Sequence, residues 1–264
     1  MVQTGFLWQH RHSPLLTCDL RAFQQQWQRQ ARCWQLAPTV LGFSGGEPLM
    51  LYQGKPALPH TLRRLVVAGF HGEEPAGVWG CLRFLQQNHP PDFMHCAFSL
   101  LPLVNAFGFS HGCRGNAQGH DTNRGFSRRL LLTREGRLLM SHAALLREAG
   151  ASGTMSCHED LSAHHAYLYT YERSSTVGSF SLGLRARMAR HFILKKSGTA
   201  DGYRCHRGII FNQQDDSFEC WMASLGVPLV ACTETPGKRD FEERIRANAA
   251  LNRHFLLHTS ATAF

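Results

Sequence analysis

The sequence lacks the features that would place it in a membrane or send it out of the cell. It contains no stretch of eighteen or more apolar residues, so no segment is expected to cross a membrane as a helix. Its first ten residues, MVQTGFLWQH, include Trp, Gln and His but no Lys or Arg, which is unlike a secretory signal peptide. We therefore expect a cytoplasmic protein without a membrane partner.

Paired cysteines are also missing. The chain has nine cysteines, an odd number, and no two of them are spaced as Cys-x-x-Cys. This pattern excludes a cysteine-based structural zinc site of the usual kind. In a chain without a secretion signal, the cysteines are expected to be reduced and mostly buried thiols.

Basic residues exceed acidic ones, but they form no long run. Lys and Arg number 28 against 19 Asp and Glu, so the formal net charge is +9. The basic residues occur in ones and twos and no aromatic residues alternate with them, so we expect a solvated basic surface and no nucleic-acid partner. No repeat, low-complexity tract or linker interrupts the sequence, and residues 1–264 are predicted to form one domain. No feature indicates an oligomeric state.

Hydrophobic periodicity predicts strands that alternate with helices. Expected strands span residues 39–43, 49–52, 62–70, 95–104, 153–157 and 228–233, and a twenty-residue loop spans 105–124. Expected helices span residues 19–34, 133–149, 179–192, 215–225 and 240–257, with another that follows Pro75 and ends near residue 88. This order is typical of an α/β fold with a mostly parallel sheet.

The stretch around residues 65–74, LVVAGFHGEE, reads as a buried strand, a tight turn and the start of a helix. His71 and Glu74 are three residues apart there, so an imidazole and a carboxylate can converge on one metal ion. The spacing alone is weak evidence. The alternative is a strand-end histidine satisfied by backbone, with the acids favouring a helix N-terminus.

Two later strands also end on residues of the same chemistry, namely His158 and Glu234. The carboxyl ends of parallel strands meet at one edge of an α/β sheet, where ligands bind. Two histidines, one glutamate ligand and one free carboxylate are the composition of a zinc hydrolase.

The chain resembles zinc metallocarboxypeptidases, the family that includes carboxypeptidase A and bacterial murein peptide amidases. That family has an HxxE motif after a strand, matched by His71 and Glu74, and a third ligand on a later strand, matched by His158. Further matches are the loop arginine, Arg114, the D-x-N-R motif at residues 121–124, and the late glutamate, Glu234. The resemblance implies a three-layer sandwich with a mixed, mostly parallel central sheet and helices on both faces.

The resemblance also implies a role for each residue. His71, Glu74 and His158 would bind zinc, and Glu234 would act as general base toward the attacking water. Arg114 would stabilise the oxyanion, and Asn123 and Arg124 would bind the terminal carboxylate of a small peptide or N-acyl amino acid.

Some positions leave alternatives open. The family's N-P-x-G tract appears here as residues 105–108, Asn-Ala-Phe-Gly, which loses a rigid turn but no reacting group. The residues with open roles are Glu73 as a ligand in place of Glu74, His164 or His165 as an extra metal ligand, and Tyr171 or Tyr203 as the family's mobile tyrosine.

The short chain resembles the bacterial intracellular members most, so murein-derived peptides are candidate substrates. Three acids before Glu234, namely Asp215, Asp216 and Glu219, lie where the family lines its specificity pocket and would favour a basic side chain or a free amine. The alternative function is deacylation of N-acyl amino acids, as in the succinylglutamate desuccinylase and aspartoacylase group. Members of that group usually carry an extra C-terminal β domain, for which the sequence after the 240–257 helix leaves no room.

Overall fold

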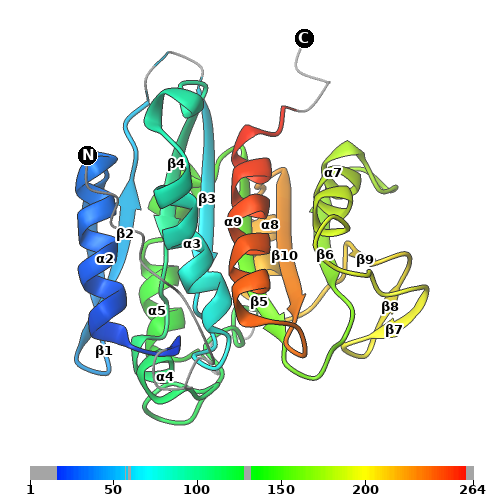
Figure 1. Ribbon diagram of the computed structural model, residues 1–264, viewed down its shortest axis with the longest axis horizontal. Coiled ribbons are helices and arrows are strands. Elements are labelled where there is room, and N and C mark those ends of the chain that lie inside the picture. Colours follow the sequence, from blue (N-terminus) through cyan, green and yellow to red (C-terminus); the bar gives the residue numbers. More distant parts are fainter. Residues whose placement is uncertain (1–16, 57, 59–60, 128–131, 260–264) are drawn as a thin grey trace, which may run out of the picture.

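The computed structural model describes residues 17–56, 58, 61–127 and 132–259, and its centre is a mixed sheet of eight strands in the order β1-β2-β4-β3-β5-β10-β6-β9 (Figure 1). The bounds of these strands, in sheet order, are Ala37–Ser44, Glu47–Gln53, Cys96–Leu101, Leu62–Ala68, Gly153–Asp160, Leu229–Pro236, Tyr167–Glu172 and Ile209–Phe211. The four central strands, β4, β3, β5 and β10, run parallel, whereas β2 and β6 run antiparallel to them. The expectation of a mixed, mostly parallel sheet is confirmed.

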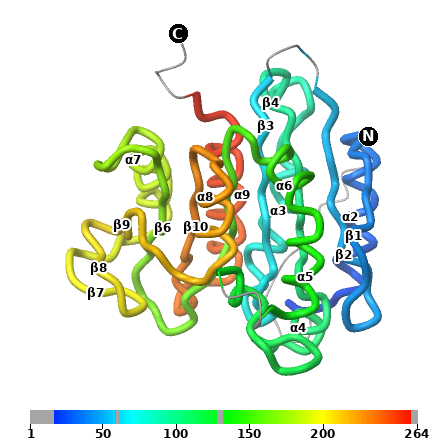
Figure 2. The backbone as a smooth tube through the Cα atoms, turned by 180° about the vertical axis from the view of Figure 1, so that it is seen from behind, coloured from blue at the N-terminus to red at the C-terminus, as the bar shows by residue number. Residues whose placement is uncertain are grey.

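Helices cover both faces of this sheet, as Figures 1 and 2 show from opposite sides. One face carries α2 (Leu20–Cys33), α3 (Pro75–Gln87), α7 (Ser179–Met188) and α9 (Phe241–Leu257). The other carries α5 (Arg134–Ser141), α6 (Ala143–Ala149) and α8 (Phe218–Ser224). The remaining elements are the 3-10 helix η1 (Pro90–Phe93), α4 (Ala106–His111) and a small hairpin of β7 (Gly198–Ala200) and β8 (Tyr203–Cys205).

Two hydrophobic cores fill the spaces between the layers, and β3 supplies both. Leu65 and Val67 point into the core beneath α5, α6 and α8, while Val66 and Ala68 point into the core beneath the other helices. All four side chains are fully buried. The uninterrupted apolar run in the sequence is therefore that of a central strand covered on both faces.

Several elements differ from the expected ones. The tract 105–124 contains α4, because the Asn105 side chain caps the helix by accepting a hydrogen bond from Gly108 N at 2.8 Å. The expected helix 133–149 is broken at His142 into α5 and α6. Strands β6 to β9 were not expected, since three of them have only three residues and their pairing is long-range.

Strands β5 and β10 are longer than expected. They continue to Asp160 and Pro236, so His158 and Glu234 lie inside strands and not just beyond them. The expected strand 62–70, in contrast, ends at Ala68, and His71 follows in the turn. Among the described residues, no helix combines the length and apolar character needed to cross a membrane.

Candidate active site

The turn between β3 and α3 holds His71 and Glu74 in place. Gly69 has φ +71°, a conformation that favours glycine, and lets the chain turn as it leaves the sheet. Gly72 packs so closely on α4 that a Cβ there would lie 1.8 Å from the carbonyl carbon of Gly108. Glu74 is the N-cap residue of α3 and Pro75 begins the helix. The turn is therefore fixed by backbone contacts on both sides.

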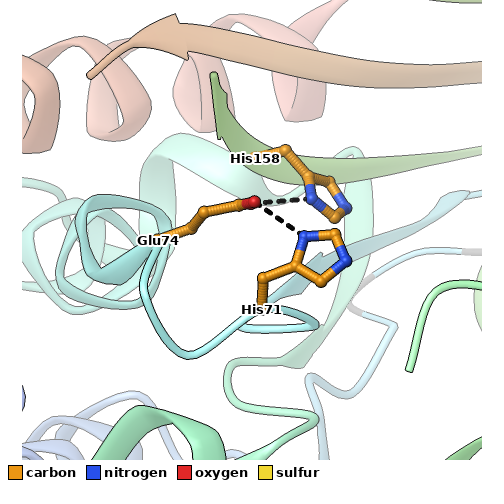
Figure 3. Close-up of side chains that lie close together, drawn as sticks. All are labelled: His71, Glu74 and His158. Carbon is orange, nitrogen blue, oxygen red and sulfur yellow. Dashed lines mark hydrogen bonds and ion pairs between the residues drawn. The ribbon is translucent and has the colours of Figure 1, made fainter. Parts of the chain in front are cut away.

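His71, Glu74 and His158 form one buried cluster (Figure 3). His71 Nδ1 lies 2.7 Å from Glu74 Oε1, and His158 Nδ1 lies 2.9 Å from Glu74 Oε2. One ligand-capable atom from each residue lies within 4.8 Å of the others. Both rings thus turn the same nitrogen, Nδ1, toward a shared carboxylate.

Each histidine has a carboxylate near its other ring nitrogen. Asp121 Oδ1 lies 2.9 Å from His71 Nε2, and Glu219 Oε1 lies 3.6 Å from His158 Nε2. Although burial opposes ionisation, the hydrogen bond to His71 and the nearby guanidinium of Arg114 hold the pKa of Asp121 well below its usual range. Such partners orient a ligating imidazole and fix its tautomer.

Arg114 reaches the cluster from the loop after α4. Its Nε and Nη2 donate to Asp121 Oδ2 at 3.1 and 2.8 Å, and Nη1 lies 3.4 Å from Glu74 Oε1. Two donors on one carboxylate fix the plane of the guanidinium. The side chain is therefore held beside the cluster while it remains partly exposed to solvent.

The electrostatics of the cluster suit a divalent cation. Burial raises the pKa of Glu74, but His71 and His158 outweigh it and lower the pKa to about 2. Burial lowers the pKa of His158, but Glu74 and Glu219 outweigh it and raise the pKa well above its usual value. The buried carboxylates thus favour a positive charge within the cluster. Two imidazole nitrogens and a carboxylate oxygen are ligands that zinc accepts, and its binding would displace protons.

Glu234 lies next to this cluster on β10. It pairs with His158 in the parallel register of β10 and β5, so the two side chains leave the sheet on the same face. Burial, together with Glu74, raises the pKa of Glu234 to about 8 against the lowering effect of His158. A cation bound at the cluster would lower this pKa, because it favours the carboxylate.

The cluster, Arg114, Glu219 and Glu234 border one cavity of about 290 Å³. Arg124 is an exposed side chain on its wall, and four carboxylates, Asp121, Asp215, Glu219 and Asp201, raise its pKa against the effect of burial. Asn123 is buried, and its amide is engaged: Oδ1 accepts from Phe218 N at 2.9 Å and Nδ2 donates to Glu219 Oε2 at 3.2 Å. Of the two expected carboxylate-binding residues, Arg124 therefore presents the freer donors.

The three acids proposed for the specificity pocket have different positions. Asp215 and Glu219 line the cavity, but Asp216 does not. Asp216 accepts hydrogen bonds from the backbone N–H groups of Gly125 and Ser127, at 2.9 and 2.7 Å. It therefore braces the chain after Arg124 and does not face a substrate in the cavity.

The cavity also has wall residues that the sequence did not point to. Tyr167 and Tyr169 lie on β6, and their hydroxyls donate to Asp160 Oδ2 and Asp201 Oδ2 at 2.9 and 2.7 Å. Sequence reasoning missed them because β6 was not predicted. Asp121 stands in the quoted D-x-N-R motif, which was the available signal for its contact with His71.

The open alternatives have different structural outcomes. Glu74, and not Glu73, contacts both histidines; Glu73 is half-buried with Oε1 3.9 Å from Arg114 Nη1. His164 and His165 are exposed and belong to none of the metal-capable groups formed by the described residues. Tyr171 lines the cavity, whereas Tyr203 packs on Tyr169 and is not one of the lining residues.

Comparison with known proteins places the chain in a family. A candidate metallopeptidase from Shewanella baltica is 38% identical over 91% of this chain and 92% of its own, with a TM-score of 0.87. The chain belongs to the family of this metallopeptidase. The model of the succinylglutamate desuccinylase/aspartoacylase catalytic domain matches residues 60–174, which hold His71, Glu74, Arg114 and His158. Membership of this family implies a metal and supports a hydrolase.

More distant structures share the fold. The metallo-carboxypeptidase from Burkholderia cenocepacia is 16% identical over 90% of this chain and 68% of its own, with a TM-score of 0.66. The murein-tripeptide amidase MpaA from Escherichia coli O157 is 20% identical over 88% and 97%, with a TM-score of 0.60. The expected carboxypeptidase-like α/β fold is thereby confirmed. No curated protein matches the chain.

Proposed function

We propose that this metallopeptidase family member is a zinc-dependent metallocarboxypeptidase that hydrolyses a peptide or amide bond next to a free carboxylate. The observation that carries the proposal is the buried cluster of His71, Glu74 and His158 at the base of a cavity that also exposes Arg124. The cluster would hold the metal. Zinc bound there would polarise the scissile carbonyl and make a coordinated water more acidic.

The protein's own groups would carry the proton and the charge. Glu234 lies beside His158 on the cavity wall, where its carboxylate takes a proton from the attacking water and returns it to the leaving amine. Arg114, fixed by Asp121, faces the negative charge that develops on the carbonyl oxygen. Arg114 is already in position for this role, because its hydrogen bonds to Asp121 hold it without any new contact.

The free carboxylate of the substrate would bind to Arg124. Its guanidinium carries a permanent charge and two parallel donors, which match a carboxylate better than an ammonium group does. Asn123 Nδ2 faces Glu219 and His158, so it would exchange one of these contacts to add a hydrogen bond to the carboxylate. With this assignment, the leaving group of the reaction is the C-terminal amino acid of the substrate.

The acids of the cavity favour a substrate that also carries a positive charge. Asp160, Asp201 and Asp215 all line it, and together with Arg124 they offer both signs of charge. An amino acid with a free amine and a carboxylate on its side chain, such as those in murein peptides, would complement this lining. The fold shared with a murein-tripeptide amidase supports the same choice.

Deacylation of N-acyl amino acids is the second candidate. The match of residues 60–174 to the succinylglutamate desuccinylase/aspartoacylase catalytic domain favours it. Both reactions cleave an amide and release a carboxylate-bearing amine, so the cluster, Arg114 and Glu234 would serve either one. The two reactions differ in the acyl group of the substrate.

One substrate panel tests the proposal. Purified protein loaded with one equivalent of zinc would be assayed on short peptides with basic, neutral and acidic C-terminal residues, on the same peptides amidated, and on N-acetyl-aspartate and N-succinyl-glutamate. Hydrolysis of free-carboxylate peptides and not of amidated ones supports the carboxypeptidase. Hydrolysis of the N-acyl amino acids alone supports the deacylase, and equal rates on basic and neutral peptides remove the charge preference.

A further inference from the structure

Glu219 is a buried carboxylate whose contacts all go to the site. It is 2% exposed and lies in the first turn of α8, where it faces His158 Nε2 while Glu74 faces Nδ1. Its Oε1 accepts a hydrogen bond from the Ser156 hydroxyl and lies 3.6 Å from His158 Nε2, while Oε2 accepts from Asn123 Nδ2 at 3.2 Å. One carboxylate thus connects a candidate metal ligand with the D-x-N-R tract.

The orientation of the Asn123 amide decides which group can accept a hydrogen bond from His158 Nε2. Because Asn123 Oδ1 accepts from Phe218 N, its Nδ2 faces Glu219 and His158, with 3.4 Å to His158 Nε2. The acceptor facing His158 Nε2 from α8 is therefore the carboxylate of Glu219. On the other histidine, Asp121 occupies the same position at 2.9 Å from Nε2. Both rings turn Nδ1 toward Glu74 and Nε2 toward a carboxylate, which lies at 2.9 Å on His71 and at 3.6 Å on His158.

We propose that Glu219 is a positioning residue that keeps the proton of His158 on Nε2, so that Nδ1 is presented to the metal. This inference rests on the proposed zinc site. It separates Glu219 from the acids of the cavity that would meet a substrate, because its oxygens are committed to Ser156, Asn123 and His158. It also ties the tract that carries Arg124 to the metal ligand through Asn123.

A neighbouring thiol offers a competing interpretation. Cys232 Sγ, Glu219 and His158 can each place one ligand atom within 4.8 Å of the others, which describes a second metal-capable group. Burial and the carboxylates of Glu234 and Glu219 raise the pKa of Cys232 well above its usual value. The Cys232 Sγ also lies 3.6 Å from Glu234 Oε1, whereas the oxygens of Glu219 accept from Ser156 and Asn123. The zinc content of a Cys232 variant decides between the two interpretations.

The test compares two carboxylates of the same cavity. Glu219→Gln removes the charge that faces His158, and Asp215→Asn removes a charge from the cavity wall without a contact to a candidate ligand. Zinc affinity is measured by competition with a chelating dye on both variants and on wild type. We expect Glu219→Gln to weaken zinc binding by about 10- to 100-fold, as seen when such partners of ligating histidines are changed, and Asp215→Asn to leave it unchanged.

A spectroscopic readout separates positioning from general destabilisation. Zinc-loaded wild type should show downfield imidazole N–H signals in its proton NMR spectrum for His71 and His158. Glu219→Gln should shift or remove the His158 signal alone, and Asp121→Asn the His71 signal alone. If Glu219→Gln does not fold, Ser156→Ala, which removes a donor to Glu219, should give a weaker change in the same signal.

Each outcome decides one point. An unchanged His158 signal, or an equal loss of zinc affinity in Glu219→Gln and Asp215→Asn, overturns the positioning role. Two equivalents of zinc in wild type and one in Cys232→Ser would also overturn it, in favour of a second metal. Tight zinc binding that depends on Glu219, in a protein that cleaves nothing in the substrate panel, removes the peptidase proposal and keeps this inference.

Discussion

Glu234 and His158 are paired residues on adjacent parallel strands, and this register puts a half-buried carboxylate beside a candidate metal ligand. The relationship depends on backbone hydrogen bonds and not on side-chain mobility. A base held this way is near the cluster but separate from its ligands, which is the position required of a group that moves protons.

Replacement of Glu234 by glutamine should abolish turnover without loss of metal. The amide cannot accept the proton of the water, so we expect kcat to fall by about 10²- to 10⁴-fold, the range for general acid–base groups. Zinc content, by elemental analysis, should equal that of wild type. Loss of zinc together with activity would instead make Glu234 a ligand.

Arg114→Lys should lower kcat and leave substrate affinity unchanged. Lysine cannot reproduce the two bonds of Nε and Nη2 to Asp121, so its charge would no longer be fixed beside the cluster. We expect a fall in kcat of about 10²- to 10³-fold, as for the loss of one oxyanion donor. Steady-state kinetics on the best substrate of the panel measures it. A change confined to KM would contradict the role.

Arg124→Gln should raise KM and leave kcat largely unchanged, the reverse of the effect expected for Arg114→Lys. The variant loses the charge that meets the free carboxylate, so KM should rise by at least about tenfold, which corresponds to one charged hydrogen bond of about 1.5 kcal/mol or more. The control is an amidated substrate, on which wild type and variant should be equally poor. If KM is unchanged, the carboxylate binds elsewhere in the cavity.

Gly72→Ala should destabilise the fold although alanine is a small residue. The added Cβ would lie 1.8 Å from Gly108 C and 2.1 Å from Phe109 N, and both are backbone atoms of α4. We expect a loss of about 3 kcal/mol or more in the free energy of unfolding, measured by urea denaturation, because backbone must move. Gly136→Ala is the matched control, since its nearest contact is the flexible side chain of Leu132. Equal losses in both would contradict the argument.

The histidine pair near the end of α9 should make stability fall in mild acid. Burial, and then Arg187 for His254 and Arg64 for His258, lower the pKa of both rings. The Nε2 atoms of both are buried and have no hydrogen-bond partner among the described residues. A group with a lowered folded-state pKa stabilises above its unfolded pKa, near 6.5, and this contribution is lost as the pH falls.

Thermal melting at about pH 7.5 and about pH 5.5 measures this effect. The drop in Tm between the two should be smaller in the double variant His254→Gln/His258→Gln than in wild type. His164→Gln, at an exposed position, should show the wild-type drop. A double variant that loses as much Tm as wild type would show that these rings do not titrate on unfolding.

The sequence by itself determined the fold class and predicted a metal-capable site. The spacing of His71 and Glu74 after an apolar run, followed in order by Arg114, His158 and Glu234, indicated one metal-capable site in an α/β fold. These features are local, because a strand, a turn and the start of a helix are each specified by a few consecutive residues. The helix α2 and the strands β1 and β2 were predicted for the same reason.

Tertiary structure alone decided which polar groups support the site. Nothing in the sequence distinguishes Asp216, which holds the backbone after Arg124, from Asp215, which lines the cavity, or marks Glu219 as the carboxylate that faces His158. The strand β6 with Tyr167 and Tyr169 also depends on pairing with the distant β10. Such contacts join residues about 50 to 100 positions apart, and only the packing of the sheet and its helices sets the direction of each side chain.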